Sequence, residues 1–210
     1  MKKSVKMEIV AEFGCNWNIP KQAIEMLEKC GVLGIKYAKF QMWKKLQVPE
    51  EVRDMYIDEY LAIGLMAQGA ANGVEVFFTP FYPEAVDILE KIKIPYYKIR
   101  YADYYTYDRS IMNKVLDTGK MFFISCLTPF PHIRAVSLEC APVYPAPRSG
   151  YQLIHEGFEG ISDHTRNLKL YKECLKIPRL KFFEMHVCLD KTCYEAKWSK
   201  TFDEIEEVIS

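Results

Sequence analysis

The strongest constraint on the fold is a repeated alternation of short apolar runs with amphipathic segments. Runs rich in Phe, Tyr, Val and Ile recur along the chain, and segments with helical spacing separate most of them. We expect strands at residues 7–13, 34–41, 74–78, 95–103, 120–125, 134–140, 158–161 and 181–188. Strands that alternate with helices at this spacing form parallel βαβ units. Because eight such units can close on themselves, the sequence predicts a TIM (β/α)8 barrel.

The connections around the fifth, sixth and seventh strands are unsuited to outer helices. Residues 126–133 are few and include Pro129 and Pro131, and residues 141–157 are rich in proline, with room for one helical turn near residues 151–155. Proline breaks helices, and a crossover helix needs a longer segment. We therefore expect a reduced barrel that lacks one or two outer helices around strands 5–7. Strand surface left bare there would favour self-association, so we also expect a homo-oligomer such as a dimer.

Length, charge and cysteine pattern limit the class of protein. The chain has 210 residues, half of them hydrophobic, which suits a single domain over residues 1–210 with one sizeable core. Lys+Arg and Asp+Glu both number 28, so no basic field favours nucleic acid or an anionic membrane as a partner. The seven cysteines form no CxxC pair, and no signal peptide or membrane span is evident. We expect a cytoplasmic protein with reduced cysteines.

Polar side chains stand at the ends of the predicted strands, where a β/α barrel forms its site. Lys39 and Lys98 end strands rich in Phe, Tyr and Ile, where a charge is buried only if it is paired or meets an anion. Hydroxyl groups at other strand ends add to these lysines, and together they indicate a phosphate or carboxylate site. The set is Glu12, Lys39, Gln41, Thr79, Lys98, Asp103, Ser125, Tyr144, Ser162, His164 and His186.

Two histidines, His164 and His186, lie at the ends of the last two predicted strands. Neighbouring parallel strands deliver their ends to one rim, so the two imidazoles could share a divalent metal. A lone histidine at such a place more often bonds only a nearby carbonyl. The lysines and hydroxyls at the same rim favour the metal, and together the groups indicate a phosphorylated small acid with a Lewis-acid metal.

Seven motifs in chain order resemble those of the sialic acid synthase family. They are residues 11–16, 38–41, 78–81, 97–99, 143–147, 162–165 and 184–190. The first reads AEFGCN, the second AKFQ, and the sixth SDHT. The similarity runs from about Ile9 to Ser199, nearly the whole chain. One such motif is weak evidence, but seven in the right order with barrel spacing are specific.

The resemblance implies a metal-dependent condensation of phosphoenolpyruvate with an N-acylated amino sugar such as N-acetylmannosamine, which yields a nonulosonic acid and phosphate. His164 and His186 would hold Mn²⁺ or Mg²⁺. The residues that would act in catalysis are Glu12, Lys39, Lys98, His164 and His186. Those that would bind substrate are Lys39, Gln41, Thr79, Lys98, Arg100, Asp103, Ser125, Tyr144, Ser162 and Glu195, where Glu195 replaces an aspartate of the family's acidic loop.

The chain departs from the family pattern at several of these positions. Arg100 and Tyr101 stand where the family usually has small residues and a serine that contacts phosphate. Arg100 could replace that hydroxyl as a bidentate phosphate ligand, or both bulky side chains could fill the pocket. Pro142 replaces a side-chain donor, and Trp17 replaces a histidine. The sequence ends before the family's C-terminal antifreeze-like domain, so we expect an open site or a lid supplied by a separate partner protein.

Three functions stay open on the sequence alone. The first is an enzyme of the synthase type. The second is a non-catalytic or partner-dependent barrel homologue that binds a small anionic ligand or acts as an assembly subunit, which Arg100, Tyr101 and Pro142 favour. The third, with the least support, is an aldolase that forms a Schiff base through Lys98 or Lys39. We expect the charged residues near the C-terminus to form the solvated face of a final short helix, and they include Lys197, Lys200, Asp203 and Glu204.

Overall fold

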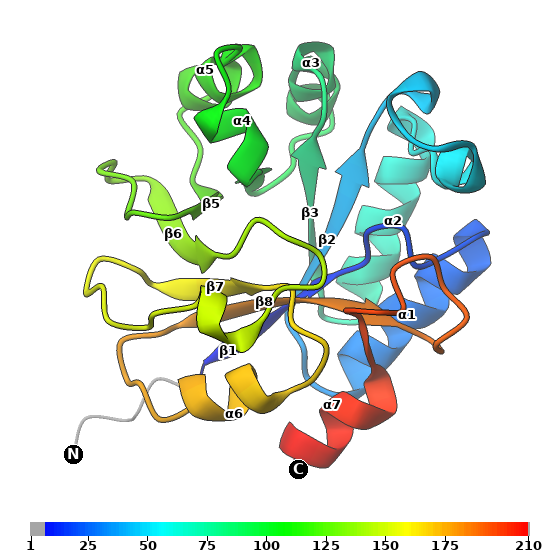
Figure 1. The fold of residues 1–210 in the computed structure, drawn as a ribbon. Coiled ribbons are helices and arrows are strands. Elements are labelled where there is room, and N and C mark those ends of the chain that lie inside the picture. Colours follow the sequence, from blue (N-terminus) through cyan, green and yellow to red (C-terminus); the bar gives the residue numbers. More distant parts are fainter. Residues whose placement is uncertain (1–6, 210) are drawn as a thin grey trace.

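The computed structural model describes residues 7–209 and contains a closed barrel of eight parallel strands (Figure 1). The strands follow one another around the barrel in chain order, and the first pairs with the eighth, Glu12 standing opposite His186. They are β1 (Glu8–Glu12), β2 (Tyr37–Met42), β3 (Glu75–Pro80), β4 (Tyr97–Ile99), β5 (Phe122–Cys126), β6 (Ala135–Cys140), β7 (Gly160–Asp163) and β8 (Phe182–Cys188). The predicted TIM barrel is confirmed.

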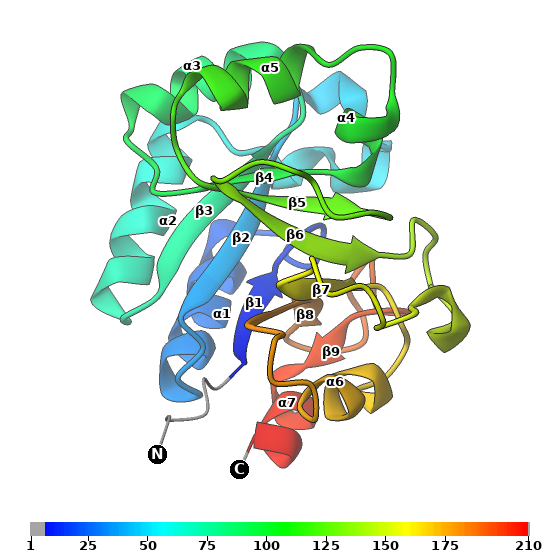
Figure 2. The same cartoon turned by 90° about the vertical axis from the view of Figure 1, so that its left-hand side faces the viewer.

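Helices cover most of the barrel from outside, as Figure 2 shows for α2, α3 and α5. They are α1 (Pro20–Val32), α2 (Glu59–Ala71), α3 (Pro83–Lys91), α4 (Tyr101–Tyr105), α5 (Ser110–Asp117), α6 (Lys169–Cys174) and α7 (Phe202–Ile209). Three short 3-10 helices are η1 (Lys45–Gln47), η2 (Glu50–Met55) and η3 (Arg148–Gly150). Helix α1 begins at Pro20, whose fixed φ suits a first helical position, and buries Ala23, Leu27 and Cys30 on one face.

The side of the barrel around β6 is built without α-helices, as predicted. No α-helix joins β5 to β6, and between β6 and β7 only η3 interrupts the loop. Instead, polar side chains on the outer face of β6 bind the covering loops. Ser137 Oγ accepts a hydrogen bond from the Phe130 N–H at 2.9 Å, and the Glu139 carboxylate accepts one from the Gln152 N–H at 2.6 Å. Because these loops cover the outer face of β6, there is no exposed strand surface among the described residues at this place that would support the expected homo-oligomer.

Several predicted boundaries are wrong for local reasons. The fourth strand ends at Ile99 rather than at Asp103, because residues 101–105 form α4. The Asp103 carboxylate accepts a hydrogen bond from the Arg100 N–H at 3.3 Å and so caps that helix. The seventh strand covers Gly160–Asp163 rather than residues 158–161. The expected helical turn near residues 151–155 is replaced by η3, three residues earlier.

An aromatic layer fills the amino-terminal half of the barrel interior. Phe77 stacks on Phe123 with ring centroids 5.2 Å apart, and Phe123 meets Phe182 edge-on at 5.1 Å. Tyr37 and Tyr96 complete the layer. Because this end is packed with apolar rings, the inward polar side chains gather at the carboxyl ends of the strands. Within residues 7–209, no helix has the length and apolar character needed to cross a membrane.

Candidate active site

A cavity of about 480 Å³ opens at the carboxyl ends of the strands. The residues expected from the sequence line it with one exception, Asp103. Those present are Glu12, Lys39, Gln41, Thr79, Lys98, Arg100, Ser125, Tyr144, Ser162, His164, His186 and Glu195. Side chains that were not assigned to binding also line it, and they are Phe81, Tyr101, Ala102, Cys140, Pro142, Glu184 and Trp198. The strand ends therefore converge on one hollow as the barrel geometry requires.

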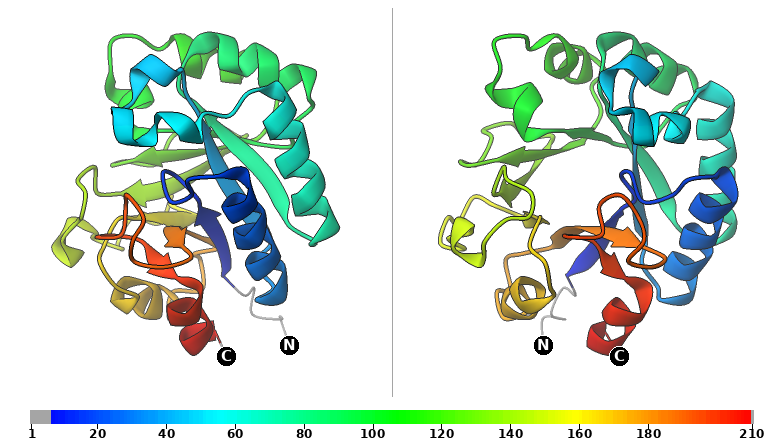
Figure 3. Two further views of the ribbon diagram at one scale, coloured as in Figure 1. Left: turned by 90° about the vertical axis from the view of Figure 1, so that its right-hand side faces the viewer. Right: turned by 45° about the vertical axis from the view of Figure 1, so that its right-hand side comes forward.

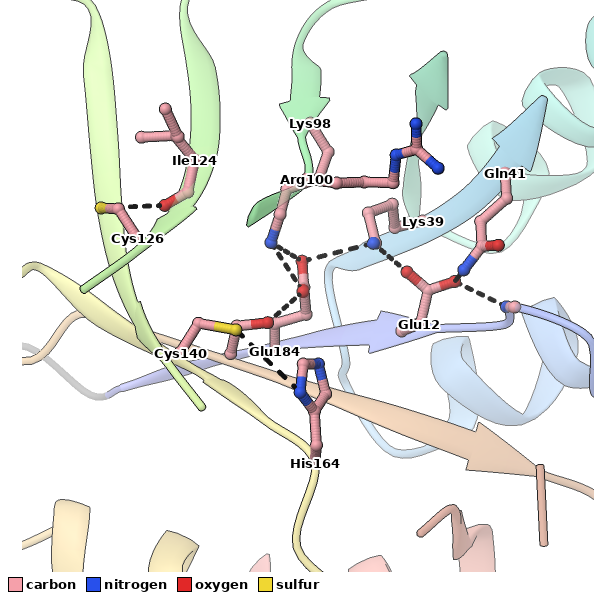
Figure 4. A network of polar contacts seen from close by, with 12 residues as sticks. Glu12, Lys39, Gln41, Lys98, Arg100, Ile124, Cys126, Cys140, His164 and Glu184 are labelled. Carbon is pink, nitrogen blue, oxygen red and sulfur yellow. Dashed lines mark hydrogen bonds and ion pairs between the residues drawn. The ribbon is translucent and has the colours of Figure 1, made fainter. Parts of the chain in front are cut away.

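An ion-pair network crosses the cavity with Glu184 at its centre (Figure 4). Lys98 Nζ lies 2.6 Å and 2.7 Å from the two carboxylate oxygens of Glu184. Ser162 Oγ donates to Glu184 Oε1 at 2.8 Å, and Lys39 Nζ lies 3.6 Å from Glu184 Oε2. Lys39 also forms an ion pair with Glu12. Both buried lysines are therefore paired, which accounts for charges at the ends of apolar strands.

The charges in this network set the protonation states of its members. Burial opposes ionisation of Glu184, but Lys39 and Lys98 outweigh it and hold the pKa of that carboxyl below its usual range. Burial also opposes the charge on Lys39, yet Glu12 and Glu184 raise its pKa. For Lys98 burial prevails over Glu184, and its pKa is lowered. Glu184 is thus an anion at neutral pH, and its charge depends on the two lysines.

The two histidines lie next to each other with their rings already oriented. Their centroids are 5.6 Å apart, and the ring planes are inclined by 68°. His164 Nδ1 lies 2.9 Å from the Ala141 carbonyl oxygen, and His186 Nδ1 lies 2.8 Å from Glu195 Oε2. In the described part of the chain no hydrogen bond occupies Nε2 of either ring. A carbonyl or carboxylate on one nitrogen, with the other left for a ligand, is the arrangement typical of metal-binding histidines.

Electrostatics differ between the two imidazoles. Burial, together with the nearby His186, holds the pKa of His164 well below its usual range, so His164 is neutral. Burial also disfavours the charged form of His186, but Glu195 outweighs it and raises the pKa. No cluster of three or more His, Cys, Asp or Glu side chains suited to a metal occurs within residues 7–209. The pair fits a cation that takes its remaining ligands from water or substrate oxygen.

Aromatic rings wall the cavity beside the histidines. Tyr144, in the loop after β6, lies 3.9 Å from His164 and 5.9 Å from His186 between ring centroids. Trp198 lies 5.5 Å from Tyr144. On the other side, the Arg100 guanidinium stacks 3.7 Å from the centre of the Phe81 ring. Aromatic rings therefore form part of the wall on both sides of the cavity.

Asp103 supports Arg100 instead of lining the cavity. Arg100 Nε and one terminal guanidinium nitrogen lie 2.8 Å and 2.5 Å from the two carboxylate oxygens of Asp103. This bidentate pair fixes the guanidinium at the rim. The sequence-based expectation that Asp103 reaches a substrate is therefore not matched by its position.

One buried hydroxyl in the cavity has no partner. Thr79 Oγ1 lies at the end of β3, is inaccessible to solvent and makes no hydrogen bond in the described structure. A buried polar group without a partner costs free energy and is uncommon in folded proteins. Thr79 lines the cavity, so its hydroxyl is a candidate group for a bound ligand oxygen.

Comparison with protein families matches residues 22–128, about half of the chain. The matching description is "NeuB family". The chain belongs to the NeuB family. It is also 30% identical over 125 residues to "Uncharacterized protein MJ1065" of Methanocaldococcus jannaschii, an alignment that covers 56% of this chain and 36% of that protein. The chain therefore spans only about a third of the length of that relative.

Solved structures share the barrel of this NeuB-family chain. An N-acetylneuraminic acid (sialic acid) synthetase from Leptospira borgpetersenii, in complex with citrate, matches with a TM-score of 0.84 at 17% identity, over 97% of this chain and 81% of that one. Spore coat polysaccharide biosynthesis protein spsE from Bacillus subtilis matches at 0.77 and 16%, over 97% and 66%. A truncated 3-deoxy-D-arabino-heptulosonate 7-phosphate synthase from Thermotoga maritima matches at 0.72 and 11%, over 97% and 84%. At these identities the likeness is one of fold.

Glu184 is the charged lining residue of this NeuB-family barrel that the sequence did not single out for binding. It lies inside β8, two residues before His186, whereas the predicted site residues stand at strand ends. Side chains two residues apart on a strand share a face, so an inward His186 requires an inward Glu184. A buried carboxylate in a strand that ends at a site was the signal that could have found it.

The segment after β8 folds over the cavity, and we name residues 189–199 the capping loop. Figure 3 shows this orange-red segment beside the dark-blue loop that follows β1. The capping loop supplies Glu195 and Trp198, and it leads into a short strand, β9 (Lys200–Thr201), that pairs with the end of β8. Lys200 is buried, so the prediction that it lies on a solvated helix face is wrong.

Proposed function

We propose that this NeuB-family barrel condenses phosphoenolpyruvate with an N-acylated amino sugar, N-acetylmannosamine-like, or with a related aldehyde, and releases phosphate and a nonulosonic (sialic) acid. The observation that carries the proposal is that one cavity holds two buried lysines, an unpartnered hydroxyl and two histidines with available Nε2 atoms. Membership of the NeuB family supports it. In this proposal residues 1–210 act as a single barrel domain.

Phosphoenolpyruvate occupies the lysine side of the cavity in this proposal. Its phosphate and carboxylate are anionic, and Lys39 and Lys98 are the buried cations that face them. Hydroxyl groups from three further strands complete this subsite, and they belong to Thr79, Ser125 and Ser162. Glu12 and Glu184 hold the two ammonium groups in place before the substrate arrives. Gln41 donates to Glu12 at 3.2 Å and fixes that carboxylate.

A divalent cation, Mn²⁺ or Mg²⁺, is the cofactor that the histidine side fits. His164 and His186 would hold it through Nε2, and imidazole ligation favours Mn²⁺ over the harder Mg²⁺. When bound, it would polarise the aldehyde oxygen of the open-chain sugar. Tyr144 and Trp198 pack beside the histidines and reduce the access of water to that side.

In this proposal the condensation forms one carbon–carbon bond and breaks one carbon–oxygen bond. The C3 carbon of phosphoenolpyruvate attacks the aldehyde carbon, a carbon–carbon bond forms, and the aldehyde oxygen takes a proton to become a hydroxyl. Water adds at C2, and the C2–O bond to phosphate breaks, which leaves a 2-keto acid and inorganic phosphate. The chain's contribution is to place C3 and the aldehyde side by side, since positioning supplies much of the rate enhancement in such condensations.

A second candidate is a non-catalytic or partner-dependent homologue that binds a small anionic ligand. Tyr101 lines the cavity, and Arg100 is already engaged by Asp103 and Phe81, which reduces the room and the free charge at the rim. A separate lid or a second copy of the chain would then be needed to complete the site. This reading predicts binding of phosphoenolpyruvate without turnover by the isolated chain.

The test incubates the chain with phosphoenolpyruvate, Mn²⁺ and a panel of N-acylated hexosamines, and follows inorganic phosphate and 2-keto acid together. Sugar-dependent release of both supports the synthase. Metal-dependent binding of phosphoenolpyruvate without either product supports the binding homologue. A chain that binds no phosphoenolpyruvate in any condition contradicts both.

A further inference from the structure

Lys200 forms a fully buried ion pair outside the substrate network. Its side chain is 1% exposed, and its Nζ lies 2.6 Å from Asp163 Oδ2. The ammonium group also donates to the Thr165 carbonyl oxygen at 2.8 Å and to the Trp198 carbonyl oxygen at 3.2 Å. A lysine has three N–H donors, so each of them has a partner here.

The partners of Lys200 belong to two segments that flank the proposed metal site. Asp163 and Thr165 stand on either side of His164, at the end of β7. Trp198 lies near the end of the capping loop, and its ring centroid lies 6.2 Å from that of His186. One ammonium group therefore ties the end of β7 to the end of the capping loop.

A second anchor holds the capping loop from the other side. Asn16, in the loop after β1, donates to the Val187 carbonyl oxygen at 2.8 Å and to Ser199 Oγ at 2.9 Å, and its Oδ1 accepts from the Glu195 N–H at 3.2 Å. Glu195 belongs to this second anchor, and its carboxylate accepts from the Cys15 N–H at 3.2 Å and contacts His186. The carboxylate that orients His186 is thus held both by the loop after β1 and by the position of the capping loop.

Stability alone does not account for a charged pair at this place. Burial disfavours the charged form of Lys200 and lowers its pKa, although Asp163 opposes that shift. Apolar side chains of similar volume in place of a buried ion pair are often neutral or stabilising. They would not bond the carbonyl groups of two separate segments. The ion pair therefore fixes the position of the capping loop relative to the end of β7.

We propose that Lys200 is a positioning residue that fixes the capping loop against β7, so that Glu195 stays bonded to His186 and Trp198 stays packed beside it. Its effect on metal affinity rests on the proposed function of the two histidines. Its effect on the loop does not, and the two effects can be measured separately.

The test uses the paired variant Asp163→Asn with Lys200→Met. Removing both charges leaves no buried ion unpaired, and the asparagine side-chain oxygen still accepts the Thr165 N–H that Asp163 Oδ1 binds at 2.7 Å. Lys197→Met is the matched control, because Lys197 is exposed in the same loop. Trp198 is a native reporter, since Trp17 and Trp43 are each 1% exposed and Trp198→Phe gives their background signal.

The paired variant should raise the acrylamide quenching constant of Trp198 at least about twofold and weaken Mn²⁺ binding about 10-fold in calorimetry, the scale of lost outer-shell support for a metal ligand. Lys197→Met should change neither. Unchanged quenching in a folded paired variant overturns the proposal. If the wild-type chain binds no Mn²⁺, the proposed function fails, and quenching alone decides the role of Lys200.

Hydrogen exchange of the wild-type chain keeps the proposal testable if the paired variant does not fold. The Trp198 and Ser199 N–H groups each bond the Glu195 carbonyl oxygen at 3.1 Å. A loop held by both anchors predicts that these amides exchange as slowly as those of β8. Exchange as fast as in the exposed residues 107–109 overturns the proposal.

Discussion

Lys98 and Glu184 meet inside the barrel in a two-point ion pair, with Nζ 2.6 Å and 2.7 Å from the two carboxylate oxygens. Both side chains are buried, and Ser162 and Lys39 share the same carboxylate. Such a pair contributes little compared with apolar packing, but removing one partner leaves an uncompensated charge. A substitution of Lys98 or Glu184 alone should therefore destabilise the fold.

Replacing Glu184 alone should be strongly destabilising. Glu184→Gln leaves Lys98 without a counter-charge, and we expect it to lower the free energy of unfolding by about 3–5 kcal/mol. Adding Lys98→Met should recover much of that loss, because both charges are then gone. Urea unfolding of the two single variants and the double variant measures the coupling. A loss below about 1 kcal/mol for Glu184→Gln would refute a central structural role for this pair.

Glu195 should control metal affinity without being the main ligand. Glu195→Ala removes the acceptor that holds His186 Nδ1, and we expect Mn²⁺ to bind about 10- to 100-fold more weakly. The exposed Glu207→Ala is the matched control and should leave the affinity unchanged. Calorimetric titration of Mn²⁺ gives both values. Equal affinities in the two variants would show that Glu195 does not support His186.

Alkaline pH should destabilise the chain partly through Tyr96. Burial, together with a hydrogen bond to Glu75, raises the pKa of Tyr96 to about 12, whereas an unfolded tyrosine titrates near 10. Because the pKa of Tyr96 is higher in the folded chain, its contribution to the free energy of unfolding is intact below about pH 10 and is lost as the pH rises through 12. Between pH 8 and pH 11 the urea midpoint should therefore fall less in Tyr96→Phe than in the wild type. The exposed Tyr107→Phe should behave as the wild type, and equal falls in all three would contradict the assignment.

Thiol reactivity should separate Cys193 from Cys126. Burial raises the pKa of the Cys126 thiol to about 11, so about one thiol in a thousand is ionised at pH 8. A hydrogen bond from Cys188 lowers the pKa of the Cys193 thiol, which is partly exposed in the capping loop. Iodoacetamide at pH 8 should therefore label Cys193 first, as peptide mass mapping can establish. Comparable labelling of Cys126 in the folded chain would contradict the structure.

The barrel could be predicted from the sequence because its strands are apolar runs at regular spacing, and most of the site followed because parallel strands end at one rim. The end of β4 could not be predicted. A hydrogen bond from the Arg100 N–H to the Asp103 carboxylate caps α4, where the sequence pattern indicated a continued strand. The tyrosine-rich composition of that stretch favours a strand.

Two residues, Glu184 and Lys200, were not predicted from the sequence, each for a different reason. Glu184 lies within a strand, and its role appears only when its face is compared with that of His186. Lys200 lies in a segment whose charges are typical of an exposed helix, while its partner Asp163 is 37 residues away. Pairing between distant segments depends on tertiary packing, which local patterns do not report.

The most direct measurement is calorimetric titration of phosphoenolpyruvate with and without Mn²⁺, on the wild type and on the variant His164→Gln with His186→Gln. We expect the wild type to bind phosphoenolpyruvate more tightly when Mn²⁺ is present. The histidine variant should still bind phosphoenolpyruvate through Lys39 and Lys98 but should lose the effect of Mn²⁺. No binding heat for the wild type in either condition would contradict a phosphoenolpyruvate site in this cavity.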